Sequence, residues 1–149
     1  MQGSGIKSVA LRAMLKAMLS PGVPTITIQK ALSLSDAALF LDCREKTEYD
    51  VSHLPNAVWV GYSDFDFSRL TDISKTQTII VYCSIGKRSH VITKKMMTAG
   101  YTNARNLVGG IFEWVNQGGS VYNGNQTTND VHVYNAFWSR WLKKGNKIF

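Results

Sequence analysis

The sequence predicts an α/β protein in which helices cover both faces of a parallel β-sheet. Short apolar segments alternate along the chain with segments of helical pattern, and this alternation is typical of βαβ units. The strand-like segments contain few polar residues, as expected for strands that are buried on both faces. A length of 149 residues and a hydrophobic content of 44% suit one domain with a buried core and additional terminal segments.

The first half of the chain contains three predicted strands. Apolar residues at helical spacing predict a helix over residues 6–19, and the segment 21–24, which contains two prolines and a glycine, ends it. The elements expected after it are a strand at 25–28, a short helix at 29–35, a buried strand at 37–42, a polar helix at 44–52 and a strand at 57–60.

The second half completes the predicted sheet with two more strands. The expected elements are a loop with a short helix at 63–70, a strand at 77–83, a helix at 90–99, a strand at 104–110 and a helix at 111–117. Gly100 and Gly118 directly follow the two helices, as is typical of helix C-termini.

Composition divides the chain into three regions. We expect a basic amphipathic arm at residues 1–22, the α/β domain at 23–123, and a basic, aromatic tail at 124–149. Both arms are expected to be helical and to pack on the domain, since exposing Trp138 and Trp141 would be costly.

The net charge of +7 comes from the two ends of the chain. Four basic residues and no acidic residue precede Asp36, four basic residues and no acidic residue follow Asp130, and the middle is nearly neutral. A nucleic-acid-binding domain would carry its own basic face, so we expect no nucleic-acid partner. Weak contact of the basic arms with a membrane surface or a protein stays an open alternative.

Cysteine and histidine usage predicts neither a disulfide framework nor a metal site. The two cysteines, Cys43 and Cys83, form no CxxC pair, and the three histidines are dispersed. We therefore expect a reducing, cytoplasmic location. The start of the chain lacks the apolar core of a secretory signal, but it is basic and free of acids, so a mitochondrial presequence is the alternative if the source is eukaryotic.

Cys83 is the candidate nucleophile, because it stands where a predicted strand ends and the sequence SIGKRS begins. Parallel sheets bind ligands at this edge. Taken alone, a cysteine at a strand end is more often an ordinary buried thiol. Here the following helix N-terminus and the cations Lys87 and Arg88 would lower the thiol pKa from about 8.5. Gly86 would permit a turn that aims backbone N–H groups at an anion.

Two known anion-binding loops fit this string poorly. A Walker A loop needs a glycine where Val81 stands and Ser or Thr where Arg88 stands. A cysteine phosphatase loop has five residues between its cysteine and arginine, whereas four separate Cys83 from Arg88. A phosphatase or arsenate reductase is therefore the weaker alternative.

The string C-S-I-G-K-R-S is similar to a C-x-S-G-x-R-S loop of the rhodanese homology domain. This domain defines a family of sulfurtransferases, and the loop is frequent in its single-domain members. The segment FLDCREKTEYDVSHLPNAVWV resembles the first signature of that family, and AGYTNARNLVGGIFEWVNQGGSVYN resembles its closing segment. The resemblance covers roughly residues 24–123, so the rhodanese-like domain is expected at 23–123.

This resemblance implies a five-stranded parallel sheet with helices on both faces and a thiosulfate sulfurtransferase activity without metal or organic cofactor. Cys83 would take the outer sulfur of a small anionic donor such as thiosulfate and form a persulfide, which cyanide or a thiol acceptor then discharges. The residues implied in substrate binding are Ser84, Ile85, Gly86, Lys87, Arg88 and Ser89. The two cations favour dianionic thiosulfate over mercaptopyruvate. A non-catalytic interaction module with the same fold is the alternative.

Two further residues are secondary candidates. The family's strand order would place Cys43 beside Cys83, which suggests a sulfur relay or a resolving disulfide, although a small core residue is the more ordinary interpretation. Arg44 either lies near the substrate or, as we favour, pairs with Glu48 at i, i+4 spacing. Asp42 is expected to cap the next helix. Ile85 replaces a serine that is frequent in relatives, and this bears on donor and acceptor identity.

Overall fold

A computed structural model describes residues 5–149, so the first four residues of the predicted N-terminal arm lie outside the described residues. Five strands form one parallel sheet in the order β1-β5-β4-β2-β3, which confirms the predicted α/β architecture. The strands of this sheet are β1 (Thr25–Ile26), β2 (Leu39–Asp42), β3 (Val58–Trp59), β4 (Ile79–Tyr82) and β5 (Ala104–Leu107).

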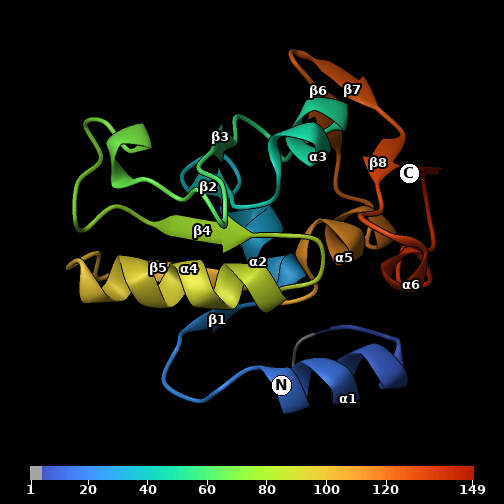
Figure 1. The fold of residues 1–149 in the computed structure, drawn as a ribbon, viewed down its shortest axis with the longest axis horizontal. Coiled ribbons are helices and arrows are strands. Elements are labelled where there is room, and N and C mark those ends of the chain that lie inside the picture. Colours follow the sequence, from blue (N-terminus) through green and yellow to red (C-terminus); the bar gives the residue numbers. More distant parts are fainter. Residues whose placement is uncertain (1–4) are drawn as a thin grey trace.

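Helices connect and flank these strands (Figure 1). They are α1 (Val9–Met18), α2 (Ile28–Ser33), α3 (Lys46–Val51), the 3₁₀ helix η1 (Phe67–Arg69), α4 (Lys87–Thr98), α5 (Gly110–Asn116) and α6 (Ala136–Ser139). The remaining strands form two small sheets: β6 (Val121–Asn123) with β7 (Gln126–Thr128), and β8 (Asp130–His132) with β9 (Asn146–Ile148).

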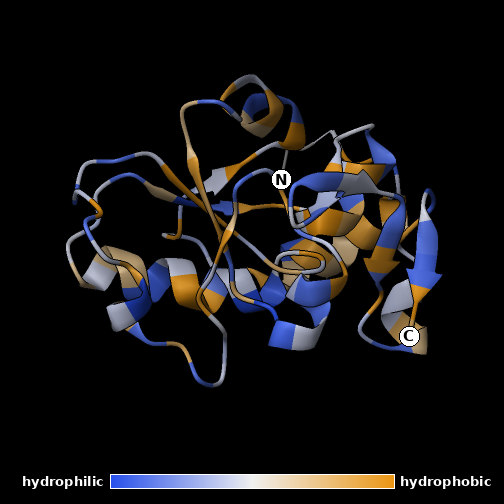
Figure 2. Ribbon diagram, turned by 90° about the horizontal axis from the view of Figure 1, so that it is seen from above, coloured by the Kyte–Doolittle hydropathy of each residue, from blue (hydrophilic) through white to orange (hydrophobic). Residues whose placement is uncertain are grey.

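Two hydrophobic clusters lie on the two faces of the large sheet. Along β4, Ile80 and Tyr82 belong to the cluster that also contains buried residues of α1, α2 and α5. Ile79, Val81 and then Cys83 belong to the other cluster, with buried residues of α4. The period of two along a strand produces this division. Figure 2 shows the apolar residues concentrated in the central strands.

Helix α1 packs on the domain through an apolar stripe. The Ser8 side chain accepts a hydrogen bond from the backbone N–H of Leu11 and so caps the helix. Leu11 and Leu15 are fully buried in the larger cluster. Beyond the helix, Ser20 Oγ lies 2.8 Å from His90 Nε2, which ties the connecting segment to α4.

The expectation of a helical C-terminal tail is wrong over most of its length. Within residues 124–149 the structure has three short strands and α6, which is four residues long. The reason is the alternation around Val131 and Val133, both buried, with more exposed residues beside them. A period of two suits a strand, whereas a helix would turn these two valines to different sides. The boundary placed at residue 123 falls inside the β6–β7 hairpin.

The expected roles of Arg44 and Asp42 are also wrong. Helix α3 has Glu45 as its N-cap, so Arg44 lies before the helix and cannot form an i, i+4 pair with Glu48. Instead Arg44 Nη2 lies 2.6 Å from Asp42 Oδ2 in a fully buried ion pair. Tyr82 also donates a hydrogen bond to Asp42, at 2.7 Å. These residues hold β2 and β4 together beneath the site.

Two element boundaries differ from expectation in ways that matter for the site. Helix α4 begins at Lys87 rather than at residue 90, so both loop cations stand in its first turn. Strand β5 ends at Leu107, and Gly109 and Gly110 belong to the start of α5.

Among residues 5–149, no helix combines the length and the apolar character needed to cross a membrane.

The packing of α1 leads to a stability prediction. Leu15→Ala should lower the free energy of unfolding by about 2–4 kcal/mol, because it removes a fully buried side chain and leaves a cavity. Val9→Ala on the same helix should change it by less than about 0.5 kcal/mol, since Val9 is 70% exposed. Urea unfolding followed by tryptophan fluorescence measures both. Equal effects of the two substitutions would show that α1 does not contribute to the core.

Candidate active site

Cys83 lies directly after β4, at the carboxyl edge of the parallel sheet, and is almost fully buried. The chain then turns through residues 84–86 and enters α4 at Lys87. Gly86 makes this turn possible, because its φ of 119° lies in the left-handed region that side chains with a Cβ rarely adopt. The short path from strand to helix places the first N–H groups of α4 beside the sulfur.

Four successive carbonyl groups of this loop are bound from outside it. Residues 109, 111 and 112 at the start of α5 donate backbone N–H groups to three of them, and the Asn106 side chain donates to the fourth. The bonds are Ile111 N to Cys83 O (2.9 Å), Phe112 N to Ser84 O (3.1 Å), Gly109 N to Ile85 O (2.9 Å) and Asn106 Nδ2 to Gly86 O (3.0 Å).

The close approach of α5 to the loop requires a glycine at position 110. A Cβ on Gly110 would lie 2.5 Å from Cys83 O and 2.4 Å from Ser84 O, and its φ is 60°. A side chain there would push α5 away from the loop carbonyls. The two consecutive glycines of the sequence therefore have a packing role in the site.

With its carbonyl groups held on one side, the loop presents its N–H groups on the other. The N–H of Gly86 donates to Cys83 Sγ at 3.1 Å. Within residues 5–149, no protein acceptor takes the backbone N–H groups of Ile85, Lys87 or Arg88. These groups form a concave set of donors, which is an anion-binding arrangement.

Ser89 links the sulfur to the neighbouring strand. Its Oγ lies 3.5 Å from Cys83 Sγ and 2.5 Å from Asn106 Oδ1, so one hydroxyl proton serves two acceptors. Asn106 on β5 thus holds both Ser89 and the Gly86 carbonyl. Asn106 was not predicted from the sequence, since an asparagine within a strand carries no local signal of this role.

The surroundings of Cys83 favour its thiolate. Burial raises the pKa of Cys83, but hydrogen bonding from Cys43, the charge of Arg88 and the hydroxyl and backbone N–H of Ser89 outweigh it. The net result is a Cys83 pKa well below its ordinary value. A thiolate is the nucleophilic form of cysteine.

Cys43 occupies the equivalent position at the end of the neighbouring strand. Strands β2 and β4 pair in parallel with Asp42 beside Tyr82, so Cys43 and Cys83 follow as neighbours. Burial and the nearby Cys83 raise the pKa of Cys43 well above its ordinary value, which keeps it a thiol. Its proton has two acceptors, the Tyr82 carbonyl at 3.3 Å and the Cys83 thiolate. Both cysteines are free, and the relay hypothesis stays a prediction.

Arg88 is paired with Glu48 of α3. The two groups form a double hydrogen bond, with Nη1 to Oε2 at 2.8 Å and Nη2 to Oε1 at 3.0 Å. Burial would raise the pKa of Glu48, but the bonds and charge of Arg88 outweigh it and hold that pKa below its usual value. Ser84 joins this network by accepting from Arg88 at 2.9 Å. Glu48 therefore pairs with the loop cation Arg88, and not with Arg44 as expected.

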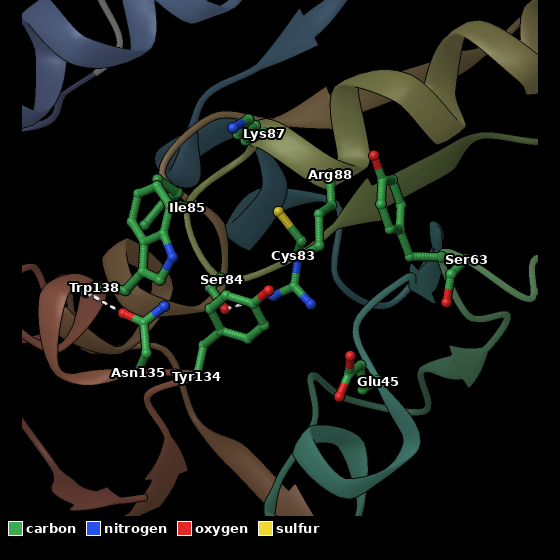
Figure 3. A pocket seen from close by; sticks show the side chains of 11 residues that line it. Glu45, Ser63, Cys83, Ser84, Ile85, Lys87, Arg88, Tyr134, Asn135 and Trp138 are labelled. Atoms are coloured by element: carbon green, nitrogen blue, oxygen red, sulfur yellow. Dashed lines mark hydrogen bonds between the residues drawn. The ribbon is translucent and has the colours of Figure 1, made fainter.

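A cavity of about 450 Å³ opens above the sulfur. Its walls come from the loop, from the segment before α3, from the segment after β3, and from the C-terminal tail (Figure 3). The predicted residues on it are Cys83, Ser84, Ile85, Lys87 and Arg88, while Gly86 and Ser89 contact the sulfur from below. Arg44 and Cys43 are fully buried and do not line the cavity.

The tail supplies three lining residues that the sequence analysis did not select: Tyr134, Asn135 and Trp138. Figure 3 shows Trp138 beside Ile85 of the loop, with Asn135 and Tyr134 on the side of the cavity away from Lys87. The Tyr134 ring lies over the Arg88 guanidinium, with 4.5 Å between the ring centroid and Cζ. The aromatic composition of the tail was the available signal, but nothing local showed that the tail returns to the strand ends.

Comparison with known proteins places these features in a family. Residues 27–117 match the rhodanese-like domain. The chain is 30% identical over 86 residues to the adenylyltransferase and sulfurtransferase uba4 of Ogataea parapolymorpha, with 58% of this chain covered. That alignment spans only 22% of the length of the yeast protein. A sulfurtransferase of Allochromatium vinosum is 27% identical, with 62% of this chain and 85% of that protein covered.

Solved structures agree on the fold. A human single-domain sulfurtransferase has a TM-score of 0.56 and 26% identity, with 64% of this chain and 98% of that chain covered. A thiosulfate sulfurtransferase of Pseudomonas aeruginosa has a TM-score of 0.61 and 23% identity, with 70% of this chain and 21% of that chain covered. The matched segment contains the loop, four of the five strands of the sheet, and the helices α4 and α5 on either side of the loop. The chain therefore belongs to the rhodanese-like domain family.

Proposed function

We propose that this protein is a sulfurtransferase that accepts sulfane sulfur on Cys83 and passes it to a thiophilic acceptor. The observation that carries the proposal is the environment of the sulfur. Cys83 has a depressed pKa, accepts the Gly86 N–H at 3.1 Å, and lines a cavity together with Ile85, Lys87 and Arg88, whose backbone N–H groups have no acceptor among residues 5–149. Relatives named sulfurtransferases support the same reaction class.

The first half-reaction needs a nucleophile and a site for the sulfur it acquires. The Cys83 thiolate attacks the outer sulfur of a donor such as thiosulfate, the sulfur–sulfur bond of the donor breaks, and sulfite leaves with the bonding electron pair. The product is a persulfide anion on Cys83. The N–H groups of Ile85, Lys87 and Arg88 are suited to hold that anion.

The second half-reaction returns the enzyme to its starting state. Cyanide or a thiolate attacks the outer sulfur of the persulfide, and the Cys83 thiolate leaves with the electron pair. A low pKa helps here as well, because a stable thiolate is a better leaving group. Two half-reactions with a covalent intermediate give ping-pong kinetics.

The alternatives have less support. In a phosphatase, the arginine of the loop must be free to bind phosphate, whereas Arg88 is held by two hydrogen bonds to Glu48 and four residues separate it from Cys83. A purely structural interaction module has no need of a cysteine with a depressed pKa at the base of a cavity.

The persulfide is directly testable. Incubation with thiosulfate should increase the intact mass of the protein by one sulfur atom, and peptide mapping should place that atom on Cys83. Cys83→Ala should show no gain and no thiocyanate formation in the presence of cyanide. Cys43→Ser keeps a hydrogen-bond donor beside the Cys83 sulfur and should still gain the sulfur atom, which distinguishes the two cysteines. A folded wild-type protein that gains no sulfur from thiosulfate would exclude thiosulfate as a donor.

The depressed pKa is testable through alkylation. Because iodoacetamide reacts with the thiolate, its rate at wild-type Cys83 should stay high as the pH falls through neutrality, well below the range where ordinary thiols become protonated. Ser89→Ala removes one stabilising hydrogen bond, so the midpoint of the rate profile should move to higher pH.

Thr98→Ala on the exposed end of α4 is the control for the alkylation experiment and should leave the midpoint unchanged. The rate at Cys83 is followed by mass spectrometry of the labelled peptide. An identical midpoint for wild type and Ser89→Ala would show that Ser89 does not stabilise the thiolate.

A further inference from the structure

The tail residues on the cavity are held in place by the domain. Val131 and Val133 are fully buried in the larger cluster. Asn116 of α5 donates to Trp141 O at 2.9 Å and accepts from the N–H of Lys143 at 2.7 Å. Strands β8 and β9 pair on either side of α6. The tail is thus a fixed wall of the cavity.

The wall formed by the tail is largely apolar, and so is Ile85, the loop residue beside it. Trp138 packs against the larger cluster and lines the cavity, and Ile85 lines it from the loop. Figure 3 shows Trp138 on the same side of the cavity as Ile85 and Lys87. A cavity of about 450 Å³ falls within the range of roughly 300–1,000 Å³ that holds organic ligands. Thiosulfate, a small inorganic anion, would leave much of it unfilled.

The charges around the cavity favour a single negative charge on the donor. Arg88 is neutralised by Glu48, at 2.8 and 3.0 Å. Lys87 and Arg88 are the two cations that line the cavity, and Lys87 has no ion pair among residues 5–149. The carboxylate of Glu45 lines the same cavity. With the Cys83 thiolate added to these groups, the local charge sums to −1, and this charge repels a dianion more strongly than a monoanion.

We propose that Trp138 and Tyr134 of the tail make the Cys83 cavity selective for a monoanionic sulfane-sulfur donor that carries an apolar or aromatic group on its leaving sulfur. The proposal rests on the proposed sulfurtransferase function and specifies its donor. The apolar group would lie against Trp138 and Ile85, with the anionic end at the loop N–H groups and Lys87.

The chemistry of such a donor balances without any co-reactant. For an organic thiosulfonate, the Cys83 thiolate attacks the terminal sulfur and the bond between that sulfur and the sulfonyl sulfur breaks. The organic sulfinate leaves with the electron pair, and the persulfide anion forms on Cys83. Two negative charges enter the step and two leave it.

The test compares three donors: benzenethiosulfonate, methanethiosulfonate and thiosulfate. The rate of persulfide formation on Cys83 is followed by quenched-flow mass spectrometry. Each rate is divided by the rate of the same donor with free cysteine, which removes differences in intrinsic reactivity. For the wild-type protein, this rate enhancement should be largest for benzenethiosulfonate, smaller for methanethiosulfonate and smallest for thiosulfate. A largest enhancement for thiosulfate would overturn the proposal.

Variants of the wall test which residues select the donor. Trp138→Ala should lower the ratio of benzenethiosulfonate to thiosulfate enhancement by about tenfold, as expected for loss of an apolar contact in a pocket. Tyr134→Asn should lower it in the same direction, and asparagine tolerates the φ of 70° found at this position. Tyr134 is 42% exposed, so this variant should fold even if Trp138→Ala does not.

Phe149→Ala is the matched control, because it removes a tail aromatic that is 73% exposed and does not line the cavity. It should leave the ratio unchanged. Equal losses for all donors in both wall variants, or an effect confined to the acceptor half-reaction, would overturn donor selection by the tail. Failure of every donor to load the folded wild type would instead refute the sulfurtransferase function itself.

Discussion

The structure of the site depends on the hydrogen bonds that fix the carbonyl groups of residues 83–86. Three come from the N-terminal N–H groups of α5 and one from Asn106. With these carbonyl groups held away from the cavity, the same peptide units present their N–H groups to the sulfur. Gly110 permits the approach, because any Cβ there would collide with the loop carbonyls. The anion site of the loop is therefore built as much by α5 as by α4.

A second constraint is the pairing of Glu48 with Arg88. This pair joins α3 to the loop and limits what Arg88 can do, since a guanidinium with two short bonds to a carboxylate has little freedom to bind substrate. Its charge still favours the thiolate of Cys83. The Tyr134 ring of the C-terminal tail lies over the same guanidinium and so links the tail to this ion pair. One arginine thus connects three parts of the chain around Cys83.

Local pattern was sufficient to predict the sheet and its helices. Short segments rich in β-branched apolar residues, such as Ile79–Tyr82, are typical of buried strands, and their alternation with helical segments predicted a parallel sheet. The tail was predicted poorly, because its aromatic and basic residues suit several structures and its strands pair across long sequence distances. Arg44 was paired with Glu48 on spacing alone, and the true start of α3 removes that spacing.

The sequence by itself identified Cys83 as the candidate nucleophile and determined its position at a strand end, the length of the loop and the family. All of these are encoded by neighbouring residues, whose effects on one another are local. Tertiary structure alone decided that Asn106 and Ser89 hold the loop, that Glu48 holds Arg88, and that Tyr134 and Trp138 close the cavity. These contacts join residues far apart in the chain. They exist only because packing of the whole core, rather than any local preference, brings those segments to the same edge of the sheet.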